Sequence, residues 1–178
     1  MRIISGKFKK KAIYPPKNFS ARPTTDVAKE SLFNILDNEF AIENLKILDL
    51  FGGTGSISYE FASRGCTDIT CVEINTNHYN FIKKTVHELG VQKEVHVTKA
   101  NVFNYLPKCP HKYDLIFADP PYELENIETL PELIFKYQLL LPESTLIIEH
   151  SDKTLFSKSP YFTRQKTYGS VNFSFFET

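Results

Sequence analysis

The sequence predicts an α/β fold of the Rossmann-like type, in which a doubly wound, mostly parallel sheet ends in an antiparallel hairpin. From residue 45 onward, short apolar runs alternate with amphipathic stretches, and this alternation is typical of parallel strands joined by crossover helices. The last two strand-like runs, residues 161–168 and 171–176, flank Gly169-Ser170, which predicts a tight hairpin.

Apolar periodicity places the individual elements. We expect strands near residues 45–51, 69–73, 94–98, 113–118 and 144–149, and helices near residues 27–40, 56–64, 75–89, 102–106 and 126–138. Capping residues mark several helix ends, because their side chains or permissive backbones satisfy unpaired helical groups. They are Thr25 or Asp26, Asn75 or Thr76, Gly65 and Gly90.

The composition of the 178 residues, 42% hydrophobic and 24% charged, is that of a globular chain able to bury a core. No apolar run approaches the roughly 20 residues that a membrane helix needs, and no signal peptide is visible. The three cysteines have no metal-binding spacing, so we expect free thiols in the cytoplasm. The five histidines are scattered, and we expect no metal site.

A basic segment opens the chain. Residues 1–25 carry seven basic side chains and no acidic one, whereas residues 26–150 carry 10 basic and 19 acidic ones. Within the segment, residues 2–5 and 11–14 flank Gly6 and predict a hairpin. A basic arm on an acidic body is typical of contact with a polyanion, although a solvated lysine tail would carry the same charges. We expect an arm over residues 1–25 that contacts nucleic acid through Arg2, Lys7, Lys9, Lys10, Lys11 and Arg22, and a second domain over residues 26–178.

The stretch Ile-Leu-Asp-Leu-Phe-Gly-Gly-Thr-Gly, residues 47–55, is the first chemical motif. A buried strand breaks into a glycine-rich turn before a helix, so backbone N–H groups and the positive helix end would face a ligand. Asp49 places a carboxylate inside the strand, which suits a ligand with a positive charge such as S-adenosylmethionine. Glu73 ends the next strand, where an acidic side chain can hold ribose hydroxyls. A purely structural turn would need the same glycines.

A dinucleotide-binding dehydrogenase fits this pattern less well. Its fingerprint has a third glycine at the position that Ser58 occupies here. The antiparallel C-terminal hairpin also favours the methyltransferase version of the architecture.

Residues 115–122, Leu-Ile-Phe-Ala-Asp-Pro-Pro-Tyr, form the second motif. A buried strand leads directly into Asp119, and ligands bind beyond the carboxyl ends of such strands. Asp119 and the carbonyl of Pro120 can accept the two N–H groups of an exocyclic base amine, while Pro121 stiffens the loop without offering an N–H. Tyr122 offers a face on which an extruded base can stack. A turn that only closes the strand is the alternative.

Asn101 and Val102 follow the third strand. Asn101 can reach the adenine edge of a cofactor and Val102 can pack on its ring, but Asn101 suits an ordinary helix cap equally well.

With these motifs placed, the chain resembles the class I S-adenosylmethionine-dependent methyltransferases and, more closely, the RsmD family of bacterial small-subunit ribosomal RNA guanine-N2 methyltransferases. Four blocks carry the likeness, which covers nearly the whole chain: Arg2-Ile3-Ile4-Ser5-Gly6; Arg22-Pro23-Thr24-Thr25-Asp26 with Glu30 and Leu32-Phe33-Asn34-Ile35-Leu36; Leu48 to Gly55; and Asp119-Pro120-Pro121-Tyr122. The second block is the most specific, because generic methyltransferases lack it.

The resemblance implies roles for particular residues. The residues implied to bind the cofactor are Asp49, Phe51, Gly52, Gly53, Thr54, Gly55, Glu73 and Asn101. The residues implied to hold the target base are Asp119, Pro120, Pro121 and Tyr122. The match at Asn101 requires an offset of one residue. The arm and Arg22 would contact ribosomal RNA, within a small-subunit particle or free.

Other functions share parts of this pattern. A DNA adenine-N6 methyltransferase also uses Asp-Pro-Pro-Tyr, but the chain has little length for a separate DNA-recognition region. A protein glutamine methyltransferase has Asn at the position of Asp119. A non-enzymatic RNA-binding module would not need Asp119, Tyr122 and the glycine turn together.

Overall fold

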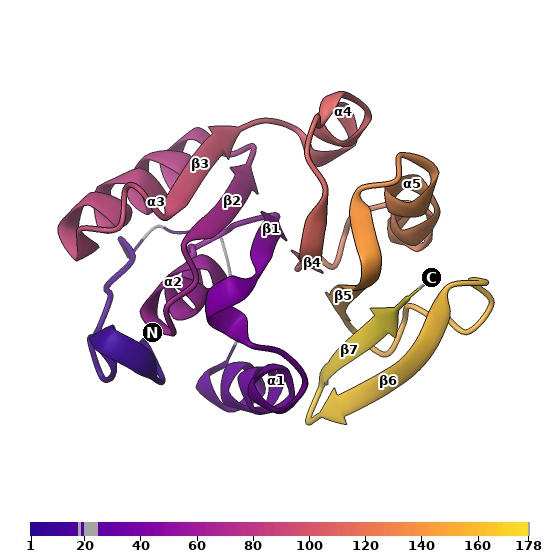
Figure 1. Ribbon diagram of the computed structural model, residues 1–178, viewed down its shortest axis with the longest axis horizontal. Coiled ribbons are helices and arrows are strands. Elements are labelled where there is room, and N and C mark those ends of the chain that lie inside the picture. The colour runs from indigo at the N-terminus through magenta and orange to yellow at the C-terminus, as the bar shows by residue number, and fades with distance from the viewer. Residues whose placement is uncertain (18, 20–24, 178) are drawn as a thin grey trace.

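The computed structural model describes residues 1–17, 19 and 25–177. Seven strands form one sheet in the order β3-β2-β1-β4-β5-β7-β6, as Figure 1 shows. The first five strands pair in parallel, and β7 pairs antiparallel with both β5 and β6. The predicted doubly wound sheet with a C-terminal antiparallel hairpin is therefore confirmed.

The strands and helices have the following bounds. The strands are β1 Lys46–Leu50, β2 Asp68–Glu73, β3 Val95–Lys99, β4 Tyr113–Ala118, β5 Leu140–His150, β6 Phe162–Tyr168 and β7 Val171–Phe176. The α-helices are α1 Asp26–Glu39, α2 Ser56–Ser63, α3 Thr76–Leu89, α4 Val102–Tyr105 and α5 Leu130–Lys136. Thr25 and Asn75 cap α1 and α3 with their side chains, and Gly90 ends α3 in the left-handed region.

Side chains from alternate strand positions make two cores, one on each face of the sheet. Ile47, Leu115 and Ile147 pack with the apolar stripes of α1, α2 and α3, which we call the α1–α3 face. Leu48 and Ile116 pack with residues of α4 and α5 on the opposite, α4–α5 face. These two cores hold the sheet rigid between its helices and so fix the ends of its strands.

Three elements differ from the predicted bounds. Strand β5 begins at Leu140 rather than near residue 144. Leu140 already pairs with Tyr113 of β4, and a bulge around Glu143, which has φ 59°, takes up the extra residues before the regular pairing resumes at Thr145. The helix expected over residues 126–138 is a 3₁₀ turn, Ile127–Thr129, followed by α5, whose first turn contains Pro131. The two N-terminal segments pair around the 3₁₀ turn Gly6–Phe8 through an isolated antiparallel bridge between Arg2 and Ala12, with backbone bonds such as that from the N–H of Ile3 to the carbonyl of Lys11, and they form no regular strands.

The described residues contain neither a candidate membrane-spanning helix nor a candidate three-residue metal site. None of their helices combines the length and the apolar character needed to cross a bilayer. No group of three His, Cys, Asp or Glu side chains within the same residues is arranged to hold a metal ion.

Candidate active site

The two chemical motifs lie side by side at the carboxyl edge of the sheet. Strands β1 and β4 are direct neighbours, with Leu50 opposite Ala118 in the register. The backbone N–H of Asp119 donates to the carbonyl of Leu50 at 3.3 Å, so both loops leave the sheet from the same point. The strand order reverses between β1 and β4, and such a switch point is where open α/β sheets bind their ligands.

The glycine turn follows β1 with three residues in the left-handed region. Phe51 has φ 62°, Gly53 has φ 55° and Gly55 has φ 78°. A Cβ added to Gly55 would lie 2.3 Å from the hydroxyl of Tyr59, and one added to Gly52 would lie 2.4 Å from the sulfur of Cys71. The backbone of the turn therefore lies against α2 and against the neighbouring strand β2, with no room for a side chain at Gly52 or Gly55. Phe51 adopts a backbone conformation that is strained for a side chain of its size.

Glu73 holds this turn from the neighbouring strand. Its carboxylate accepts bonds from the N–H of Gly53 and the N–H of Asn75, both at 2.7 Å, and its side chain is buried. The predicted ribose-binding residue thus also organises the turn itself. A carboxylate oxygen has two acceptor positions, so these bonds leave capacity for a ligand hydroxyl.

Asp49 lies in the middle of β1 and is only 2% exposed. The hydroxyl of Ser58 donates to its carboxylate at 2.5 Å. Ser58 stands where the dinucleotide fingerprint has its third glycine, and here its side chain holds the carboxylate of Asp49. Burial raises the pKa of Asp49 to about 7, with the Ser58 bond opposing that shift. A cationic ligand nearby would favour the charged form.

These features fit S-adenosylmethionine. The N-terminus of α2 has no side-chain cap, so its first N–H groups are not satisfied in the usual way. A desolvated carboxylate stands beneath the same turn, where a sulfonium and an ammonium group would compensate its charge. The cofactor would be held by the turn over residues 51–55, with Glu73 on its ribose side.

The Asp-Pro-Pro-Tyr loop is anchored at one end and exposed at the other. Pro120 is buried, and the N–H of Leu124 bonds to the carbonyl of Pro121 at 2.9 Å, which closes a tight turn. Tyr122 occupies this turn and is 55% exposed. The turn thus presents a large aromatic ring at the edge of the sheet, where a base could stack on it.

Asn101 and Val102 open α4 near the same edge. The side-chain oxygen of Asn101 caps the helix by accepting from the N–H of Phe103 at 2.9 Å, as the alternative interpretation of this residue expected. Val102 is 4% exposed and packs in the core of the α4–α5 face, which leaves it little surface for a cofactor ring. A contact of Asn101 or Val102 with adenine stays a prediction.

The N-terminal segment packs on the α1–α3 face. Ile3 and Ile13 are buried in that core, while Lys7, Lys9, Lys10 and Lys11 are exposed. Arg2 forms an ion pair with Asp26 at 2.9 Å and remains partly exposed. The sixth predicted RNA contact, Arg22, lies outside the described residues.

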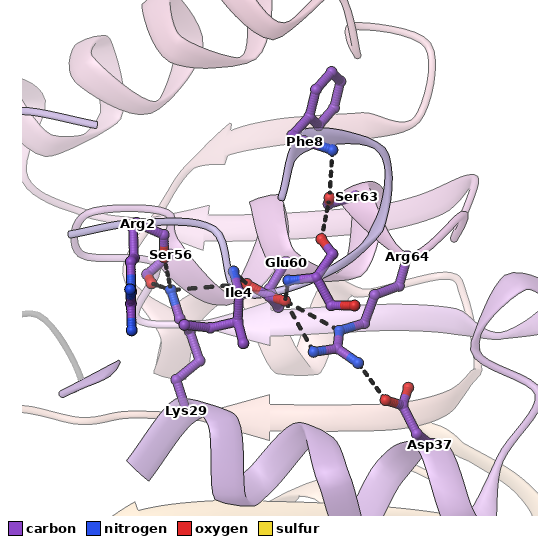
Figure 2. A network of polar contacts seen from close by, with 10 residues as sticks. Arg2, Ile4, Phe8, Lys29, Asp37, Ser56, Glu60, Ser63 and Arg64 are labelled. Carbon is purple, nitrogen blue, oxygen red and sulfur yellow. Dashed lines mark hydrogen bonds and ion pairs between the residues drawn. The ribbon is translucent and has the colours of Figure 1, made fainter. Parts of the chain in front are cut away.

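Sequence reasoning missed a buried polar network beside the site, shown in Figure 2. The ammonium of Lys29 and the carboxylate of Glu60, which are 1% and 0% exposed, lie 3.8 Å apart between α1 and α2. A charged residue on an apolar helix stripe was the available signal, because Lys29 shares its face with Leu32 and Phe33.

Comparisons with known proteins find relatives and structural neighbours among methyltransferases. Ribosomal RNA small subunit methyltransferase D of Buchnera aphidicola subsp. Baizongia pistaciae is 35% identical over 152 residues, which are 85% of this chain and 76% of that protein. A solved structure described as a putative methyltransferase, yhhF, from Escherichia coli superposes with a TM-score of 0.86 at 25% identity, over 99% of this chain and 96% of the other.

An RNA methyltransferase from Salinibacter ruber, solved with S-adenosyl-L-homocysteine, shares the fold with a TM-score of 0.69 at 15% identity, over 87% of this chain and 92% of that one. The family model described as conserved hypothetical protein 95 matches residues 1–177. The chain therefore belongs to this family, the RsmD family.

Proposed function

We propose that this protein is an S-adenosylmethionine-dependent methyltransferase that modifies the exocyclic N2 amine of a guanine in small-subunit ribosomal RNA. One observation carries the proposal: the glycine turn above Asp49 and the Asp-Pro-Pro-Tyr loop leave adjacent strands at one point, joined by the bond from Asp119 to Leu50. This adjacency supports a cofactor site in the turn and an amine-holding role for the loop. The related methyltransferase of Buchnera indicates the substrate class.

The loop orients and activates the exocyclic amine. The lone pair of this amine is delocalised into the base, so the amine is a poor nucleophile. Asp119 accepts one N–H and the carbonyl of Pro120 the other, which favours the pyramidal form of the nitrogen and localises the lone pair on it, in line with the methyl group. Asp119 also takes the proton that the amine loses. Bound S-adenosylmethionine supplies an electrophilic methyl group, and the loop contributes orientation and charge stabilisation.

The substrate RNA meets the exposed lysines of the N-terminal arm. Lys7, Lys9, Lys10 and Lys11 neutralise phosphates, while Tyr122 stacks on the extruded guanine. Specificity rests on RNA shape or on the surface of an assembled particle. The free thiols of Cys66, Cys71 and Cys109 agree with a cytoplasmic location.

The decisive experiment identifies the product. Small ribosomal subunits from a strain that lacks this gene are incubated with the purified protein and methyl-labelled S-adenosylmethionine, and the digested RNA is separated into nucleosides. Labelled N2-methylguanosine is the expected result. Label in methyladenine of control DNA, with unlabelled RNA, would instead identify a DNA adenine-N6 methyltransferase.

A further inference from the structure

A buried lysine joins the N-terminal arm to the cofactor side of the molecule. The ammonium of Lys29 donates to the backbone carbonyl of Arg2 at 2.7 Å and to the hydroxyl of Ser56 at 2.9 Å. Figure 2 shows it rising from α1 between these two partners. Ser56 is the first residue of α2 and directly follows Gly55 of the glycine turn. One side chain therefore contacts both the arm and the start of the helix that faces the cofactor.

The arm is also fixed along the rest of α2. The carboxylate of Glu60 accepts from the N–H of Ile4 at 2.8 Å and from the N–H of Ser5 at 2.9 Å, and Arg64 bonds to the same carboxylate. At the far end of the helix, the hydroxyl of Ser63 donates to the carbonyl of Ser5 at 2.5 Å and accepts from the N–H of Phe8 at 3.0 Å.

The backbones of the arm and of α2 are in direct contact at Gly6. A Cβ added to Gly6 would lie 1.9 Å from the carbonyl oxygen of Ser63, so the arm backbone rests directly on the helix backbone. Because the Glu60 carboxylate is buried and its bonds are charge-assisted, breaking them would leave an unpaired carboxylate inside the protein. The arm and α2 should therefore move as one body.

We propose that Lys29 and Ser56 couple RNA contact by the arm to the geometry of the glycine turn, so that RNA and cofactor strengthen each other's binding. Lys29 is then a positioning residue, which acts on the cofactor through Ser56. The inference rests on the proposed function, since it assumes that the turn binds S-adenosylmethionine and the arm binds RNA. Coupling of this kind is reciprocal, so cofactor binding must also tighten the arm.

The test uses two serine variants of the same helix. Ser56→Ala removes only the bond from Lys29 to the start of α2, and alanine is tolerated at a helix start. Ser63→Ala is the matched control, because it removes arm bonds at the opposite end of α2, away from the glycine turn. Lys29→Met alone would be ambiguous, since it can unfold the protein.

Two measurements are made with S-adenosylhomocysteine as the probe. Calorimetric titration should show about 5- to 10-fold weaker binding to Ser56→Ala, as the loss of one hydrogen bond implies, and binding within about twofold of the parent for Ser63→Ala. Hydrogen exchange should show that the probe slows exchange of the Ile4 and Ser5 amides in the parent and in Ser63→Ala, but not in Ser56→Ala.

The outcomes separate this inference from the proposed function. If the parent protein does not bind the probe, the function itself fails. If the parent binds it and protects only the glycine turn, with arm exchange unchanged, the coupling is refuted and the function stands. Equal loss of affinity in both serine variants would also refute it, because the effect would then be general loosening of the arm.

Discussion

The two faces of the sheet differ in whether their buried side chains carry charge. The α1–α3 face holds the buried Lys, Asp and Glu side chains of the described residues, on its helices or at strand positions that point toward it. They are Lys29, Asp49, Glu60, Glu73 and Glu149. The core of the α4–α5 face is formed by aliphatic and aromatic residues such as Leu146 and Ile148, and its buried polar side chains include His150 and Ser174, which bond to each other at 2.8 Å.

This difference separates stability from function within one small domain. Apolar packing on the α4–α5 face needs no defined partners and tolerates no buried charge. Lys29, Asp49, Glu60 and Glu73 are instead held by specific donors or acceptors, as Glu73 is by Gly53 and Glu60 by Ile4. Those partners lie in the glycine turn and the arm, so the polar face carries the parts that meet ligands.

The largest expected effect lies at the edge where the faces meet. Asp119→Ala should lower turnover by about 100- to 10,000-fold, the range for losing a proton-transfer group, while binding of S-adenosylhomocysteine stays within about twofold. Methyl transfer to small subunits and calorimetric titration measure the two quantities. Glu123→Ala removes an exposed carboxylate from the same loop and should stay active. Weak cofactor binding by Asp119→Ala would instead assign Asp119 to the cofactor site.

The second prediction tests whether the charges of Lys29 and Glu60 depend on each other for the stability of the fold. Glu60→Gln leaves Lys29 without its counter-charge, which should lower the free energy of unfolding by about 3–5 kcal/mol in urea titrations. The double variant Lys29→Met/Glu60→Gln should lose less than the sum of the two single variants, because no unpaired charge remains.

A matched change on the α4–α5 face sharpens this contrast. Leu146→Ala should lower the free energy of unfolding by about 2–5 kcal/mol through a cavity, without changing affinity for the cofactor.

Additive effects of Lys29→Met and Glu60→Gln on the free energy of unfolding would contradict the view that the α1–α3 face depends on specific pairs.

The third prediction concerns pH. Burial raises the pKa of Asp49 from 3.8 to about 7, so the folded protein retains a proton that the unfolded chain has lost, and this group lowers stability as the pH rises from about 4 to 7. A cationic ligand prefers the charged carboxylate, so affinity for S-adenosylmethionine should increase up to about tenfold between pH 6 and pH 8. Asp49→Asn should abolish this rise; an equally steep rise in that variant would assign the titration to another group.

The smallest effect on the fold is expected at the arm. Replacing Lys9, Lys10 and Lys11 with Ala should change the free energy of unfolding by less than about 0.5 kcal/mol, because all three side chains are exposed. It should weaken RNA binding and reduce the slope of log affinity against log salt by about 2 to 3. Binding measured over a series of salt concentrations would detect this, and an unchanged slope would identify the lysines as a solvated tail.

Local patterns in the sequence were sufficient for the sheet and for both chemical loops. The glycine turn after β1 and the Asp-Pro-Pro-Tyr loop after β4 each combine an apolar run with residues that allow only a few backbone conformations. Parallel strands bring their carboxyl ends to one edge, so the neighbourhood of Asp49, Glu73 and Asp119 followed from topology alone.

Tertiary structure decided what surrounds these motifs. Lys29 and Glu60 are 31 positions apart, and no local pattern pairs a lysine of one helix with a glutamate of another. The same holds for the arm, whose charge suggested a separate appendage but whose Ile3 and Ile13 enter the core. The pKa of Asp49 also depends on burial by distant segments. Periodicity and turn chemistry act between neighbours in the chain, whereas desolvation and ion pairing depend on which segments meet in space.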